Sequence, residues 1–256
     1  MRLKLLAAAA TAAAATLTLT LTTSAQASHS WGGYHWARTS NPFTLQLGDN
    51  LSSTWKSYLS TASSDWSSSA VLDTTVVTGQ SNSSCRATSG RVEVCNRTYG
   101  NNGWLGLASI SLSSGTHISS GTVQLNDTYF NTSTYNTPSW RTMVTCQEVG
   151  HTFGLDHQDT NQTNTNLGTC MDYTNSPDGP PSNLHPNSHD YSELSTIYSH
   201  TDSSSTVGLA ADVPSVGKSK KSWGKRVEHS DSTGVDTYVR DFGRGKAVVT
   251  YVFWAN

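Results

Sequence analysis

The sequence predicts a protein of the α+β class, because patterns of both helix and strand occur between residues 31 and 201. Apolar residues within 55–66 recur at steps of three and four, the spacing of an amphipathic helix. Short runs of β-branched and apolar residues follow, and clusters of Gly and Asn separate them. The 256 residues allow one large domain, or one domain with an appendage.

Three helices are expected. The first has an apolar stripe made of Trp55, Tyr58, Leu59, Ala62 and Trp66, after an N-cap candidate at Asn50 or Ser52. The second begins at Thr137, which is followed by Pro138 in the first helical position, and should end at Gly154. The third covers about 189–200.

Strands are expected at 71–78, 91–95, 104–112 and 122–125. Beyond residue 201 the composition changes, and the stretch 202–222 has the Ser, Gly and Lys content of a linker. The runs 237–242 and 247–254 predict a β-hairpin with its turn at 243–246. Its second strand is nearly all apolar, so we expect the hairpin to pack on the main domain or on another partner.

The N-terminus has the features of a secretory signal peptide. Arg2 and Lys4 precede an uncharged stretch at 5–21, and Ala25-Gln26-Ala27 fits the small-x-small cleavage rule. A membrane anchor is the alternative, but the stretch is rich in Thr and ends at a good cleavage site. We therefore expect a secreted, extracellular protein with no membrane attachment, divided into 1–27 (signal peptide), 28–201 (main domain), 202–222 (linker) and 223–256 (hairpin extension).

Four cysteines remain after residue 27, an even number that indicates disulfides in an exported protein. Three connectivities are possible. We predict Cys85–Cys95 and Cys146–Cys170, because each pair is close in sequence and brackets a turn or loop. A zinc site made of cysteines is disfavoured, since the sequence lacks paired CxxC spacing.

The overall charge gives no sign of a polyanionic partner. The formal net charge is -2, and only 13% of the residues are charged. We therefore expect no binding to nucleic acid.

The stretch 147–157 carries the chemistry that the sequence suggests. Gln147 and His151 lie four residues apart, so one helix face would present both to a single metal ion, with Glu148 beside them. Gly154 can adopt the left-handed conformation that reverses the chain and returns His157 as a third ligand. Three protein ligands and an open position for water are typical of catalytic zinc.

At these residues the chain resembles the metzincin metalloproteases, whose pattern is HExxHxxGxxH followed by a Met-turn. Glu148, His151, Gly154 and His157 match, and Cys170-Met171-Asp172-Tyr173 resembles the Met-turn. The resemblance covers about residues 34–201. It implies a twisted, mostly parallel sheet with an antiparallel edge strand, an active-site helix and a C-terminal helix, and it implies that extended peptide substrates bind along 104–110.

The resemblance also implies roles for single residues. Glu148 would be the general base of a zinc endopeptidase, and Tyr173 would contact the zinc or the tetrahedral intermediate, unless it is a core aromatic. Met171 would lie under the metal. A Cys146–Cys170 bridge would then join the metal-binding helix to the turn beneath it.

Gln147 departs from the family pattern, which has histidine at this position. A carboxamide oxygen is a harder and weaker zinc ligand than imidazole nitrogen, so zinc should be held less tightly. Retention of Glu148 favours an active hydrolase. The alternative, a metal-free pseudo-protease that binds peptides or proteins without cutting them, stays open.

Further candidates lie around the motif. His185 or His189 could replace the missing ligand from outside it. The polar loop residues Asp156, Asp159, Asn161, Asn164 and Asp172 could bind calcium, although a solvated loop fits them as well. We expect a monomer. No cysteine-bearing propeptide follows residue 27, so latency is either absent or supplied by the chain after residue 202.

Overall fold

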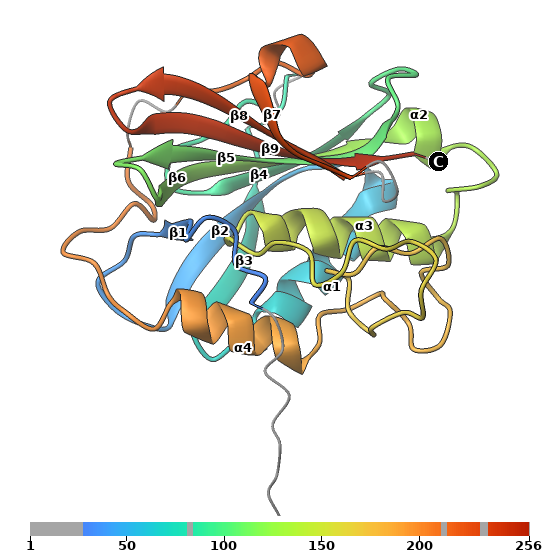
Figure 1. Cartoon of the computed structure of the whole chain (residues 1–256), viewed down its shortest axis with the longest axis horizontal. Helices are drawn as coiled ribbons and strands as arrows, with labels where there is room; N and C mark the ends of the chain where they lie inside the picture. Colours follow the sequence, from blue (N-terminus) through green and yellow to red (C-terminus); the bar gives the residue numbers. More distant parts are fainter. Residues whose placement is uncertain (1–27, 81–83, 211–213, 231–234, 256) are drawn as a thin grey trace, which may run out of the picture.

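The computed structural model describes residues 28–80, 84–210, 214–230 and 235–255. The predicted signal peptide, 1–27, lies outside this range. The chain forms one nine-stranded sheet with α1 (Ser53–Trp66), α3 (Pro138–His151) and α4 (Ser188–Ile197) below it in the view of Figure 1. None of the helices among the described residues is both long enough and apolar enough to cross a bilayer.

The first half of the sheet is mostly parallel, which confirms the mixed α+β class. Its strand order is β3-β2-β4-β6-β5, and only β5 runs antiparallel to its neighbour β6. The strands are β2 (Phe43–Asn50), β3 (Leu72–Thr78), β4 (Val92–Arg97), β5 (Trp104–Ser113) and β6 (His117–Asn126), and the short β1 (His35–Trp36) also pairs with β6.

Strand β2 is absent from the sequence prediction. It alternates buried Phe43, Leu45 and Leu47 with exposed Thr44 and Gln46. That period of two is the pattern of a half-buried strand, so its signal was present in the sequence.

The three long helices form close to their predicted ranges, each with its own start signal. Ser52 occupies the N-cap of α1, and the Thr137 hydroxyl caps α3 by accepting a hydrogen bond from Trp140 N at 3.2 Å. Asn187 forms a capping box with Asp190 at the start of α4. A four-residue helix, α2 (Asp127–Phe130), follows β6 directly.

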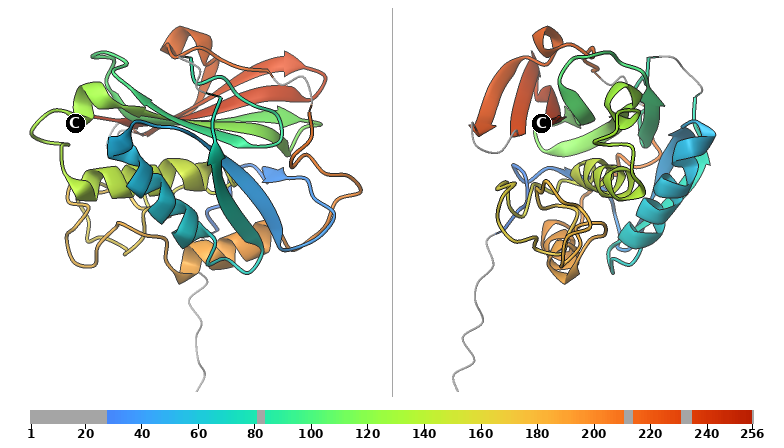
Figure 2. Two further views of the ribbon diagram at one scale, coloured as in Figure 1. Left: turned by 180° about the vertical axis from the view of Figure 1, so that it is seen from behind. Right: turned by 90° about the vertical axis from the view of Figure 1, so that its right-hand side faces the viewer.

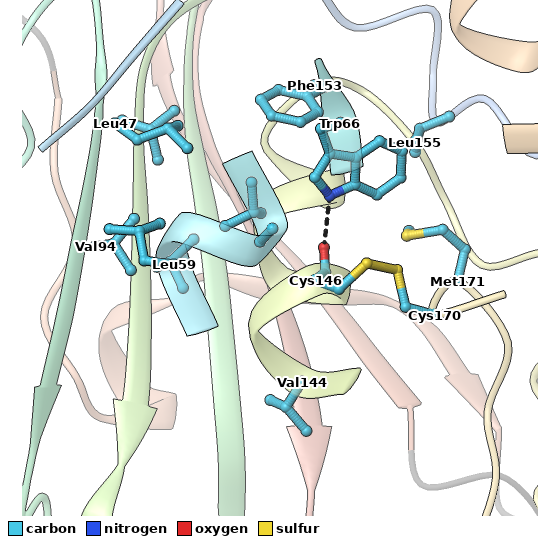
Figure 3. Packing of buried hydrophobic residues seen from close by; sticks show 14 of the residues in the cluster. Leu47, Leu59, Trp66, Val94, Val144, Cys146, Phe153, Leu155, Cys170 and Met171 are labelled. Carbon is cyan, nitrogen blue, oxygen red and sulfur yellow. Dashed lines mark hydrogen bonds between the residues drawn. A yellow bond between two sulfur atoms is a disulfide. The ribbon is translucent and has the colours of Figure 1, made fainter. Parts of the chain in front are cut away.

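The main hydrophobic core lies between the sheet and the helices α1 and α3 (Figure 3). Trp66 is fully buried, and its indole N–H donates to the Cys146 carbonyl at 3.1 Å, which fixes α1 against the middle of α3. Gly150 allows this approach: a Cβ there would lie 2.6 Å from the Trp66 ring and 2.7 Å from Met171 Sδ. The position of α3 therefore depends on α1 and on the turn at Met171 together.

The C-terminal chain extends the same sheet. The predicted hairpin is confirmed as β8 (Val235–Gly243) and β9 (Lys246–Trp254), and β7 (Lys225–Ser230) adds a third strand after the 3-10 turn η1 (Lys220–Ser222). Strand β9 pairs antiparallel with β5 along most of its length. These strands appear in red beside the green β5 in Figures 1 and 2.

The expectation that the resemblance implies, an edge strand open to substrate along 104–110, is therefore wrong. Strand β5 has β6 on one side and β9 on the other, because an apolar strand such as β9 gains hydrogen bonds and buried area by docking on an open edge. The stretch after α4 also makes specific contacts: Asp202 N donates to Arg38 O, and Thr206 N donates to Ala37 O.

Candidate functional site

Helix α3 carries three of the predicted site residues on its last two turns. Gln147, Glu148 and His151 are all at most 1% exposed. The helix ends at His151, and Thr152 follows as its C-cap. The predicted placement of 147 and 151 one turn apart is thus realised on a buried face.

Gly154 makes the turn that brings His157 back. Its φ is +95°, and a Cβ on it would lie 2.0 Å from the Tyr34 carbonyl oxygen. Its own carbonyl accepts a hydrogen bond from Trp31 N at 3.0 Å. Only glycine tolerates both this conformation and this backbone contact.

The two predicted histidine ligands meet. His151 Nε2 and His157 Nε2 lie 3.0 Å apart. The His151 Nδ1–H donates to the Leu155 carbonyl at 2.9 Å, so in neutral His151 the lone pair lies on Nε2. Such a backbone partner is what fixes the tautomer of metal-binding histidines.

Asp156 supports His157 from the other side. Its carboxylate accepts a hydrogen bond from His157 N at 2.7 Å and lies 3.3 Å from His157 Nδ1. Burial acts to raise the pKa of Asp156, but its hydrogen bonds to His157 and its electrostatic interaction with that side chain lower the pKa overall. Asp156 therefore restrains the backbone of His157 and lies beside its ring, a contact that the sequence analysis did not predict.

Gln147 is held by one end of its amide. Its Nε2 donates to the Cys170 carbonyl at 2.7 Å, whereas its Oε1 is buried and has no hydrogen-bond partner. A buried, unpaired carbonyl oxygen is costly unless a ligand completes it. The amide thus leaves its carbonyl oxygen, the atom predicted to bind a metal, without a partner among the described residues.

Glu148 lies directly against strand β5. A Cβ on Gly106 would be 2.4 Å from Glu148 Oε1, so the strand makes room for this carboxyl only because residue 106 is glycine. The second oxygen, Oε2, is buried without a partner, and burial raises the pKa of this carboxyl well above its usual range. A raised pKa is typical of carboxyls that take up and release protons in catalysis.

These groups fit a divalent cation such as zinc. Tetrahedral zinc with ligands at about 2.0–2.2 Å separates its donor atoms by about 3.3 Å, close to the distance between the two imidazole nitrogens. The lone pair of His151 Nε2, the facing His157 Nε2 once it has lost its proton, and the unpaired amide oxygen of Gln147 are the atoms that could bind a cation together. The residues that would hold it are Gln147, His151 and His157.

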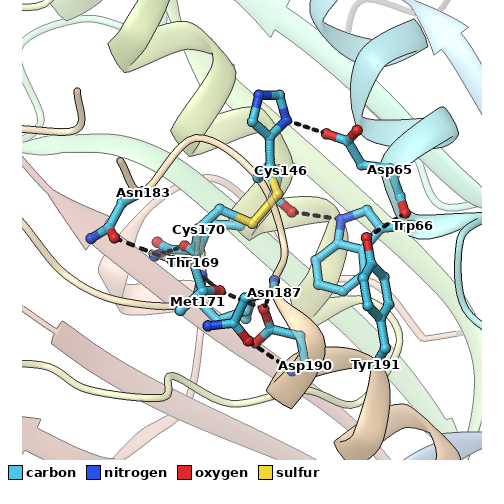
Figure 4. The surroundings of a disulfide bond; sticks show 12 residues. Asp65, Trp66, Cys146, Thr169, Cys170, Met171, Asn183, Asn187, Asp190 and Tyr191 are labelled. Carbon is cyan, nitrogen blue, oxygen red and sulfur yellow. Dashed lines mark hydrogen bonds and ion pairs between the residues drawn. A yellow bond between two sulfur atoms is a disulfide. The ribbon is translucent and has the colours of Figure 1, made fainter. Parts of the chain in front are cut away.

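The predicted disulfides Cys85–Cys95 and Cys146–Cys170 are both present. Figure 4 shows that the second joins α3 to the turn at Met171, which is fully buried. That turn is held in addition by Thr169, whose hydroxyl donates to Asp190 at 2.5 Å. The bridge lies one residue from Gln147 and one from Met171, as predicted.

Tyr173 stands beside His157, with 4.6 Å between the ring centroids. It is 1% exposed, and burial, followed by the charge of Glu148, raises its pKa well above the usual range. The phenol is therefore held protonated near the predicted metal ligands. This position fits both predictions for Tyr173, a group that contacts the zinc or the intermediate and an aromatic side chain of the core.

The C-terminal strands close the site. Tyr251 of β9 stacks on the His151 ring with 4.1 Å between centroids and an interplanar angle of 10°, and Phe253 packs on Tyr173 at 4.6 Å. Trp31 from the N-terminal segment covers Tyr251 at 3.7 Å. A cavity of about 600 Å³ exists in the molecule, but Ser109, Thr122 and Gln124 line it rather than the histidines.

The other residues proposed from sequence lie elsewhere. His185 pairs with Asp65 at 2.6 Å, and His189 stacks on His29, so neither joins His151 and His157. The loop residues suggested for calcium bond with their own loop: Asn164 donates to Asp159, and Asp172 Oδ2 accepts from Leu167 N. Among the described residues, the group of His, Asp and Glu side chains that could hold a metal ion includes none of these carboxylates.

One group of potential metal ligands was missed from the sequence. His35, His200 and Asp202 bring one ligand atom each to within 4.8 Å of one another, and they could hold a metal ion. They lie far apart in the chain and match no local motif, so only the folded arrangement brings them together.

Comparisons with known proteins leave the family unassigned. No protein-family model matches the sequence. A search of curated proteins finds no significant match.

Proposed function

We propose that this chain is a secreted zinc-dependent endopeptidase of the metzincin type, held in a closed form by its own C-terminal strands. The observation that carries the proposal is the meeting of His151 and His157 Nε2 at 3.0 Å at the end of the helix that also carries two buried, unpaired oxygens, Gln147 Oε1 and Glu148 Oε2. The two disulfides fit an exported protein.

Gln147, His151 and His157 would hold the zinc, which when bound supplies Lewis acidity to polarise a peptide carbonyl and acidify water. Glu148 would accept a proton from the attacking water and deliver it to the leaving amine nitrogen. Its place against Gly106 sets that carboxyl next to β5, along which an extended peptide would lie. Tyr173, held protonated, would donate a hydrogen bond to the developing oxyanion.

In the closed form, the C-terminal strands would keep such an enzyme latent. Strand β9 occupies the side of β5 that a substrate backbone would use, from the Leu112–Ala247 pair to the Trp104–Trp254 pair. Tyr251 covers His151, and Glu148 is 1% exposed. Hydrolysis would therefore require displacement of β9.

The second candidate is a metal-free scaffold that binds without cutting. The departure at Gln147 and the complete burial of the site favour it. It predicts no zinc at the histidine pair and no hydrolysis after the tail is released.

The test uses the full chain with a recognition site for a specific protease inserted between Leu209 and Ser215. Cleavage there breaks the chain before the C-terminal strands. After cleavage, a broad peptide library is digested by the wild type and by Glu148→Ala in parallel. We expect cleavage products only from the nicked wild type, and only before zinc is removed by a chelator. Equal absence of products from both, with zinc absent and the tail shown to dissociate, would favour the binding scaffold instead.

A further inference from the structure

We propose that His35, His200 and Asp202 hold a second zinc ion, and that this ion fixes the junction where the chain leaves α4 and enters the C-terminal segment. The His35 and His200 Nε2 atoms lie 3.2 Å apart. Asp202 Oδ1 lies 3.5 Å from the first and 3.8 Å from the second. These separations bracket the value of about 3.3 Å expected between donors on tetrahedral zinc.

The donor atoms are aimed by partners outside the group. The His35 Nδ1–H donates to the Gly33 carbonyl at 2.8 Å, which leaves the lone pair on Nε2. Asp202 Oδ2 accepts from Arg38 N at 3.1 Å and from Arg38 Nη1 at 2.9 Å, so Oδ1 is the oxygen that faces the histidines. His35 thus has its second ring nitrogen engaged and Nε2 presented, and Asp202 has Oδ2 engaged and Oδ1 facing the histidines.

The Arg38 guanidinium, which lies beside Asp202, is a positive charge that opposes a cation. It is buried, and its Nη2 donates to the carbonyls of Tyr198 and His200 while Nε donates to Asn41. Its charge is therefore spread over acceptors on the far side of Asp202. His117 Nε2, 3.2 Å from the same Asp202 Oδ1, adds a further group that stabilises the carboxylate.

The donor chemistry selects the metal. Two imidazoles and one carboxylate suit zinc better than calcium or magnesium, which prefer oxygen ligands alone. The His200 side chain is 46% exposed, which gives the ion a path from solvent and leaves a fourth position to water.

The site joins segments that are far apart in sequence. His35 belongs to β1, whereas His200 and Asp202 follow α4, and hydrogen bonds from Asp202 N to Arg38 O and from Thr206 N to Ala37 O continue the same contact. Zinc here would hold the start of the segment that leads to β7, β8 and β9. This site shares no residue with the His151 and His157 pair, so the proposal for it does not depend on the proposed catalysis.

The test is a zinc titration of the metal-free full chain, with the stoichiometry and affinity obtained by competition against a chelator of known affinity. His200→Ala is the variant, because this half-exposed side chain can be removed without emptying the core. His185→Ala is the matched control, since that side chain is 52% exposed and also pairs with a carboxylate. Circular dichroism verifies that both are folded, and His200→Asn is the reserve variant.

We expect His200→Ala to bind one zinc fewer than the wild type, or to bind it at least tenfold more weakly, and to lose the rise in thermal midpoint that this zinc gives. His185→Ala should match the wild type. This difference stands whether or not the Gln147 site binds zinc, because that site is unchanged in all three proteins. Equal stoichiometry and affinity in the wild type and His200→Ala would overturn the proposal, as would an equal loss in His185→Ala.

Discussion

Replacing Tyr251 by Ala tests most sharply whether β9 keeps the histidine site closed. The Tyr251 ring is 1% exposed, stacks on His151 and lies against Trp31. Removing a buried aromatic ring costs about 3–5 kcal/mol in lost packing and cavity formation. If that cost falls on the docking of β9, the ratio of closed to open molecules drops roughly a hundredfold to a few thousandfold.

Tyr251→Phe is the matched control. The Tyr251 hydroxyl is buried without a hydrogen-bond partner, so phenylalanine keeps the ring and removes an unpaired polar atom. This variant should stay closed, with a stability equal to or above that of the wild type.

The assay combines hydrogen exchange of the β5 amides with hydrolysis of a quenched peptide substrate by the full chain. Tyr251→Ala should accelerate both at least tenfold, and Tyr251→Phe should accelerate neither. Fast exchange without hydrolysis would refute the proposed activity. A folded Tyr251→Ala protein in which neither quantity changes would refute the covering role of β9.

Three further predictions follow from the site. Gly106→Ala should displace the Glu148 carboxyl, since the new Cβ would lie 2.4 Å from its Oε1. Measured after release of the tail, kcat should fall at least tenfold with zinc content unchanged, and a wild-type kcat would contradict the placement of the base. Cys146→Ser combined with Cys170→Ser opens a loop with a sequence separation of 24 and should lower the free energy of unfolding by about 3 kcal/mol in urea denaturation, whereas a loss below about 1 kcal/mol would count against the bridge as a major constraint. Gln147→His should raise zinc affinity at least tenfold in a competition titration, because imidazole is the better zinc ligand; an unchanged affinity would mean that this position does not touch the metal.

The parts that the sequence predicts well are those that depend on neighbouring residues. Thr137 and Pro138 mark the start of α3, Gly154 marks the turn that reverses the chain after this helix, and 243–246 marks the hairpin turn. Each is a backbone constraint that acts over a few residues. The pairing of Cys146 with Cys170 also followed from short separation in the chain.

The parts that escaped prediction depend on contacts between distant segments. The apolar sequence of β9 predicts that this strand is buried against another part of the protein. It does not predict pairing with β5, because no local pattern specifies which open sheet edge the strand joins. The meeting of His35 with His200 and Asp202 is likewise a consequence of how β1 and the end of α4 pack. The approach of Glu148 to Gly106 becomes meaningful only once the helix and strand are placed.

The central claim is that two imidazoles and one carboxamide converge on a zinc ion beside Glu148. Diffraction at the zinc absorption edge from crystals of the full chain soaked in zinc tests it directly. The claim predicts an anomalous peak about 2.0–2.2 Å from His151 Nε2, His157 Nε2 and Gln147 Oε1. Crystals that bind zinc elsewhere, with no peak between these three atoms, would contradict it.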